Sequence, residues 1–95
     1  MLSELFEIIL DRQKNPKSGS YTNKLLDSDL DVILQKVGEE SVEVILAAKG
    51  QGDQRLVEEI SDLFYHTLVL LVRQGLSLAD VEAELRRRHL APKAG

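Results

Sequence analysis

Apolar residues recur at intervals of three and four along most of this chain, the spacing that places them on one side of an α-helix. The pattern predicts helices over residues 1–14, 20–26, 28–49, 53–74 and 77–88. Pro16, Gly50, Gly52 and Gly75 fall between these segments, where proline and glycine end helices. The sequence carries no strand alternation and no internal repeat, so the pattern favours an all-α bundle with two long antiparallel central helices.

Short polar residues mark the expected helix starts. The segments Ser28–Asp31 and Ser77–Asp80 resemble capping boxes, in which a serine and an acidic residue bond each other's backbone. Asp53 is the expected cap of the second long helix, and either Ser20 or Thr22 is the expected cap of the short one.

Ninety-five residues suit one domain over residues 1–95, with a flexible tail from about residue 90. The chain has no cysteine, which excludes disulfides and thiolate metal sites. Its longest apolar runs are far shorter than the ~18 residues of a membrane span, and no export signal opens it, so we expect a cytoplasmic protein.

Acidic residues are concentrated in the two long helices. Glu39, Glu40 and Glu43 lie within an arc of roughly 100° on a segment that is otherwise apolar nearly all round. Glu59 and Asp62 form a second acidic pair one turn apart. If the two helices pack antiparallel, these carboxylates converge, and several buried carboxylates require compensating cations. Because only oxygen ligands are offered, the pattern predicts a Mg²⁺ or Mn²⁺ site.

The net charge of −4 largely reflects this cluster, since it holds five of the 16 acidic residues and the chain has 12 basic ones. No basic stripe of the kind that binds duplex nucleic acid is present. The plainer alternative to a metal site is a solvated acidic face with lysine partners, for example Lys36 with Glu40.

His66 follows Asp62 by one helical turn, which leaves two interpretations open. It could orient a carboxylate or touch the substrate, or it could simply be a partly buried histidine that bonds near Asp62.

Hydroxyl and lysine side chains suggest where phosphate could bind. Ser20, Thr22 and Lys24 stand at the start of a helix, where free N–H groups favour anions, although a capped connector explains them as well. Lys36 lies one turn before the glutamates and could reach a phosphate or simply balance charge. The sequence contains no Gly-rich phosphate loop, no Glu-x-x-His motif and no nucleophile elbow.

Several motifs together resemble the phosphoribosyl-ATP pyrophosphohydrolase family, within the MazG-like superfamily of all-α NTP pyrophosphatases. The resemblance extends from Leu5 to about Arg88. It rests on these pieces: Glu39-Glu40-x-x-Glu43 followed by Glu59-x-x-Asp62, Ser20-Tyr-Thr-x-x-Leu25, Ile33-Leu-Gln-Lys-Val-Gly-Glu-Glu40, and Asp62-Leu-Phe-Tyr-His66.

The resemblance implies Mg²⁺-dependent hydrolysis of phosphoribosyl-ATP to phosphoribosyl-AMP and pyrophosphate, the second step of histidine biosynthesis, by a stand-alone homodimeric enzyme. Carried over by motif, Glu40, Glu43, Glu59 and Asp62 would hold the ions, and Glu39 would assist as a base or outer group. Ser20, Thr22, Lys24 and Lys36 would contact phosphate, and His66 would support the ligands or touch the substrate.

Two other functions remain open at this stage. A house-cleaning enzyme of the same superfamily would act on non-standard nucleoside triphosphates, and a non-catalytic helical module would bind a basic partner through its acidic face.

Overall fold

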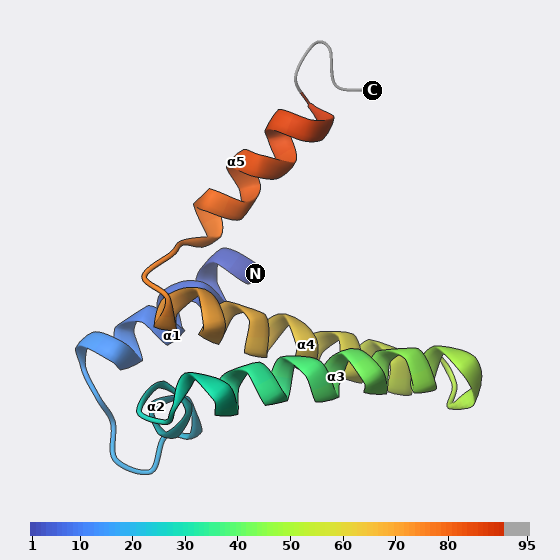
Figure 1. Ribbon diagram of the computed structural model, residues 1–95, viewed down its shortest axis with the longest axis horizontal. Helices are drawn as coiled ribbons and strands as arrows, with labels where there is room; N and C mark the ends of the chain where they lie inside the picture. The colour runs from blue at the N-terminus through green and yellow to red at the C-terminus, as the bar shows by residue number, and fades with distance from the viewer. Residues whose placement is uncertain (91–95) are drawn as a thin grey trace.

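The computed structural model describes residues 1–90, which form five helices and no strand (Figure 1). The all-α prediction is therefore confirmed for this part of the chain. The predicted tail from about residue 90 lies, apart from Leu90, outside the described residues. None of the helices in residues 1–90 is both long and apolar enough to span a lipid bilayer. The helices are α1 (Leu2–Lys14), α2 (Tyr21–Leu26), α3 (Leu30–Gly50), α4 (Asp53–Arg73) and α5 (Leu78–His89).

The two long helices α3 and α4 run antiparallel and pack against each other along their length (Figure 1). They are joined by a turn in which Gly52 has φ 89°, a left-handed conformation that costs glycine little because it has no Cβ. This tight turn places the second half of α3 beside the first half of α4, which is where the acidic residues stand.

Two of the predicted caps are wrong. Asp29, not Ser28, precedes α3, and the Ser28 hydroxyl donates instead to the Leu25 carbonyl at the end of α2, 2.6 Å away. The Ser28 side chain therefore caps the end of α2, and Asp29 occupies the N-cap position of α3. Gly52 precedes α4, so Asp53 is its first residue and makes no cap bond.

The other two predicted caps are confirmed. The Ser20 side chain accepts a hydrogen bond from the Asn23 backbone N–H at the start of α2. Ser77 and Asp80 form the predicted reciprocal capping box at the start of α5.

The hydrophobic core lies at one end of the hairpin, where α1 and α2 lie against α3 and α4 (Figure 1). The C-terminal half of α4 supplies three of its seven buried members, the largest share, while α3 contributes a single member, Ile33. The core therefore fixes one end of the hairpin and leaves the turn end without covering helices. Its buried members are Phe6, Ile9, Leu25, Ile33, Leu68, Val69 and Val72.

Helix α3 is apolar on most sides but is not enclosed on all sides in the single chain. Leu34, Val42, Ile45 and Leu46 are exposed, because no helix of residues 1–90 covers that face. Helix α5 projects away from the other four and exposes Val81 and Leu85 (Figure 1).

Candidate functional site

Three of the predicted ligands converge between α3 and α4. Each of Glu40, Glu59 and Asp62 offers a carboxylate oxygen, and these oxygens all lie within 4.8 Å of one another. The antiparallel packing brings them together, with Glu40 from α3 and the other two from successive turns of α4. Glu59 is 3% exposed, Glu40 is half-buried and Asp62 is open to solvent. The cluster therefore has a buried floor and an accessible rim.

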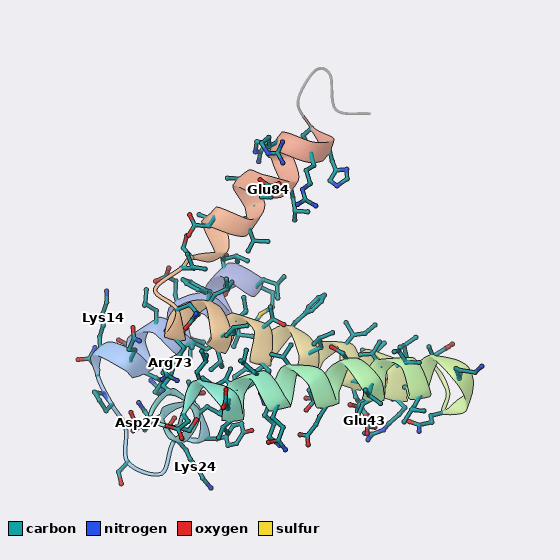
Figure 2. The ribbon with its side chains drawn as sticks, in the orientation of Figure 1. Lys14, Lys24, Asp27, Glu43, Arg73 and Glu84 are labelled. Carbon is teal, nitrogen blue, oxygen red and sulfur yellow. The ribbon has the colours of Figure 1, made fainter. Side chains whose placement is uncertain are left out.

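Glu43 and Glu39 lie outside this group of oxygens. Glu43 is half-buried and stands nearer the turn of the hairpin (Figure 2). Glu39 is exposed, accepts a hydrogen bond from Gln35 Nε2 at 3.1 Å and lies 3.9 Å from Lys36 Nζ. Lys36 thus pairs with Glu39 and not with Glu40, the partner suggested by the solvated-face alternative.

The surroundings of Glu40 raise the pKa of its carboxyl group above the ordinary value of 4.5. Burial is the largest cause, followed by the negative charge of Asp62 and a hydrogen bond with Glu59; the charge of His66 opposes the shift. Burial and neighbouring negative charge therefore both disfavour the ionised form of Glu40.

This shift predicts that Glu40→Gln raises the stability of the metal-free protein near neutral pH. Because the folded-state pKa is raised, the favourable contribution of wild-type Glu40 is complete below about 4.5 and is lost as the pH rises through the folded-state pKa. Glutamine does not titrate, so the advantage of the variant should grow with pH. Melting temperatures in chelator from about pH 4 to pH 7 test this; an advantage that shrinks toward neutral pH would contradict it.

Arg55 belongs to the site although the sequence interpretation overlooked it. Its Nη2 lies 2.9 Å from the buried Glu59 Oε1, and its Nη1 lies 3.2 Å from Glu58 Oε1. The hydrogen bond to Glu58 and the charges of Glu59 and Glu43 raise the pKa of the guanidinium above its ordinary value. The four-residue spacing of Arg55 and Glu59 on one helix is a signal that could have revealed the pair.

His66 is buried beside the cluster and is bonded through both ring nitrogens. Nδ1 lies 2.8 Å from the Asp62 backbone carbonyl oxygen, Nε2 lies 3.2 Å from the Tyr21 hydroxyl, and Nδ1 is 3.9 Å from Glu40 Oε1. A carbonyl only accepts, so Nδ1 carries the proton and, in the neutral ring, Nε2 accepts from Tyr21. His66 therefore links the carboxylate cluster to α2.

Two aromatic residues reinforce this link. Tyr21 of α2 stacks on Tyr65 of α4 with ring centroids 6.3 Å apart, and the Thr22 hydroxyl bonds the Tyr65 hydroxyl. Burial raises the pKa of Tyr65 above 10, although its bond with Thr22 opposes the shift. The Tyr21 and Thr22 contacts hold α2 in register with the cluster, and Thr22 already uses its hydroxyl to do so.

A surface hollow of about 510 Å³ lies beside the start of α2. Ser20 and Lys24, two of the predicted phosphate contacts, line it together with Lys17, and Lys24 projects outward (Figure 2). Asn23 fixes its shape, because its side chain donates to the Arg12 carbonyl at 2.7 Å and accepts from the Lys17 N–H at 2.9 Å. Its two lysines and the Ser20 hydroxyl can bind an anion, although the carboxylate of Asp27 also lines the hollow.

Three arginines have hydrogen-bond partners away from the carboxylate cluster. Arg73 Nη1 donates to the Ser28 carbonyl at 2.9 Å, which ties the end of α4 to the segment before α3 (Figure 2). Arg87 and Arg88 both bond Glu84 on their own helix.

The chain is similar to known proteins along most of its length. The model of the family described as phosphoribosyl-ATP pyrophosphohydrolase matches residues 2–89. The phosphoribosyl-ATP pyrophosphatase of Listeria welshimeri is 54% identical over 88 residues, covering 93% of this chain and 84% of that protein. The protein of the same name from Lactiplantibacillus plantarum is 53% identical over 87 residues, covering 92% of this chain and 82% of that protein.

A longer relative shares the same segment. The histidine biosynthesis bifunctional protein HisIE of Thermoanaerobacter pseudethanolicus is 51% identical over 84 residues, which are 88% of this chain and 39% of that protein. The matched segment is thus less than half of that longer protein.

Proposed function

The chain belongs to the phosphoribosyl-ATP pyrophosphohydrolase family, and we propose that it hydrolyses phosphoribosyl-ATP to phosphoribosyl-AMP and pyrophosphate in histidine biosynthesis. The observation that carries the proposal is the convergence of Glu40, Glu59 and Asp62 inside a family match that spans residues 2–89. Water would cleave the bond between the α and β phosphates, and we place the reaction in the cytoplasm.

The donor set fits a hard divalent cation. All three converging groups are carboxylates, the ligands that Mg²⁺ and Mn²⁺ prefer. Burial and the negative charge of Asp62 raise the pKa of Glu40, and a bound cation would favour its ionised form. We propose that Glu40, Glu59 and Asp62 hold Mg²⁺, with Mn²⁺ as a substitute, and that Glu43 joins them from the next turn of α3.

The residues of the chain then have distinct tasks. A bound divalent ion would neutralise phosphate charge and lower the pKa of a water molecule. We propose that Glu39, an exposed acceptor next to Glu40 in the sequence, takes a proton from the attacking water or orients it. The contacts of His66 with the Asp62 backbone and with Tyr21 hold these groups in position without requiring His66 to touch the substrate.

The hollow beside α2 is our candidate for binding the phosphates of the substrate. Ser20 and Lys24 line it, whereas Lys36 approaches from α3, where it pairs with Glu39. Thr22 contributes by holding α2 against Tyr65, and it can contact a phosphate only by sharing its hydroxyl.

Measurement of pyrophosphate release tests the function. We expect turnover on phosphoribosyl-ATP in Mg²⁺ to exceed turnover on each member of a panel of standard and non-standard dNTPs. A preference for a non-standard dNTP would instead identify a house-cleaning enzyme. Tight binding to a basic protein with no turnover on any nucleotide would identify an interaction module.

Mg²⁺ should stabilise the fold, because its ligands come together only in the folded chain. A concentration 100 times the dissociation constant contributes about 2.7 kcal/mol, which for a domain of this size raises the melting temperature by about 11–22 °C. Thermal melts in Mg²⁺ and in chelator at matched ionic strength measure the shift. Asp62→Asn, which removes a ligand, is the control, and Mg²⁺ should raise its melting temperature much less. A wild-type melting temperature that is the same in Mg²⁺ and in chelator would contradict a metal site.

We also propose that the protein is a homodimer joined through the exposed apolar face of α3. Leu34, Val42, Ile45 and Leu46 lie within about 120° of one another on the helix, opposite the side that packs on α4. A second copy of this chain would bury the face, and uncovered apolar surface of this kind marks an interface.

Ile45→Glu should therefore convert the dimer to a monomer, because burying the new charge costs several kcal/mol. Sedimentation velocity measures the mass. Ile8→Glu is the matched control, since Ile8 is similarly exposed but lies on α1, and it should stay dimeric. A monomeric wild type, or a dimeric Ile45→Glu, would contradict this interface.

A further inference from the structure

We propose that Arg55 is the internal counter-ion of the carboxylate cluster, and that it yields Glu59 when a divalent cation enters. Arg55 would then set the affinity of the site for the cation. This inference rests on the proposed metal-dependent function and adds a residue that the family motifs carried over above do not include.

The first observation is the burial of Glu59. A carboxylate with 3% exposure is costly to keep charged unless a cation lies against it. Arg55 Nη2, 2.9 Å from Glu59 Oε1, provides that cation. Within residues 1–90, Arg55 is the only lysine or arginine within 4.0 Å of any of the three converging carboxylates.

The charged groups around the pair give no substitute for it. Lys36 is paired with Glu39. His66 Nδ1 lies 3.9 Å from Glu40 Oε1, so it is near Glu40 and not paired with Glu59. Glu43 adds a further negative charge that acts on Arg55. The Arg55 guanidinium therefore interacts with several carboxylates, whereas the three converging carboxylates have only this one permanent cation within 4.0 Å in residues 1–90.

The second observation is that Arg55 has another partner outside the cluster. Its Nη1 lies 3.2 Å from Glu58 Oε1, and both of these side chains are 48% exposed. Arg55 can therefore leave Glu59 without losing every carboxylate contact, and its charge can move toward water. A cation that binds Glu59 replaces one positive charge with two at the buried floor.

The opposite role for Arg55 would be to hold Glu59 in the orientation that the cation needs. The two roles predict opposite changes in the affinity for a divalent ion when Arg55 is removed. Removing a competing cation tightens binding of a divalent ion, whereas removing a support for the ligand weakens it.

The decisive measurement is the dissociation constant of Mn²⁺, followed by electron paramagnetic resonance on the full chain without substrate. We expect Arg55→Gln, and Arg55→Met as a second variant, to bind Mn²⁺ about 3- to 10-fold more tightly than the wild type. Arg87→Gln, which removes another surface arginine paired with a carboxylate three residues away, should change the constant less than about twofold. Unchanged or weaker binding by both Arg55 variants would overturn the inference.

Melting temperatures supply a second readout. Without metal, Arg55→Gln should melt below the wild type because Glu59 loses its partner, and saturating Mg²⁺ should narrow the difference. A difference that persists or widens in Mg²⁺ would overturn the displacement. A wild type with no saturable Mn²⁺ binding would overturn the metal site itself, whereas a wild type that binds, with variants that bind no tighter, would overturn only the role of Arg55.

Discussion

Asp62→Asn and Glu40→Gln are each expected to lower pyrophosphate release from phosphoribosyl-ATP by more than about 100-fold, while the helical circular dichroism signal persists. The loss should exceed the 10- to 100-fold typical of residues that only orient metal ligands, because each change removes a ligand charge itself. Neither side chain belongs to the hydrophobic core, so folding does not depend on them. Steady-state turnover in Mg²⁺, with the dichroism spectrum of the same sample, measures both effects.

The control for this prediction is Asp53→Asn, which removes an exposed carboxylate from the first turn of the same helix as Asp62. It should change turnover by less than about twofold, because surface charges outside such clusters contribute little. If Asp62→Asn or Glu40→Gln retains near wild-type turnover in Mg²⁺, the ligand assignment is wrong, whatever the function of the protein.

The sequence contained enough information to predict the helices and the meeting of the carboxylates. Helical periodicity places Glu40 on one face of α3, and the three-residue spacing of Glu59 and Asp62 places both on one face of α4. The short turn at Gly50–Gly52 then requires the two helices to run antiparallel. These are local properties, and Ser77–Asp80 formed its capping box for the same reason.

Contacts between distant segments could not be read from the sequence in this way. Tyr21 and His66 are 45 positions apart, and their hydrogen bond depends on how α2 lies against α4. Ser28 shows the same limit over a shorter distance. The sequence predicted that it caps α3, but its hydroxyl donates to the Leu25 carbonyl at the end of α2. Periodicity gives the faces of a helix but not the partner that each face meets.

That limit also explains the outcome for α3. Its residues are apolar on most sides, a pattern typical of a buried helix, yet one apolar face is open in the single chain. The pattern indicates that this apolar face is covered by a partner. We propose that the partner is a second copy of the chain.

Ile9→Ala is expected to lower the free energy of unfolding by about 2–5 kcal/mol, a large part of the stability of a small domain. Ile9 is 1% exposed and joins α1 to the core residues of α4, so truncation removes buried methyl groups and leaves a cavity. Urea unfolding followed by circular dichroism measures the change.

The neighbouring Ile8 provides an unusually close control for this prediction, since it lies on the same helix and is 51% exposed. Ile8→Ala makes the same chemical change, so the difference in helix propensity between isoleucine and alanine cancels between the variants. It should cost less than about 1 kcal/mol, which leaves burial as the cause of the contrast. Because α1 packs on the end of α4 away from Glu59 and Asp62, turnover per folded molecule should be retained in both variants. Equal losses of stability in the two variants would show that α1 does not anchor the core through Ile9.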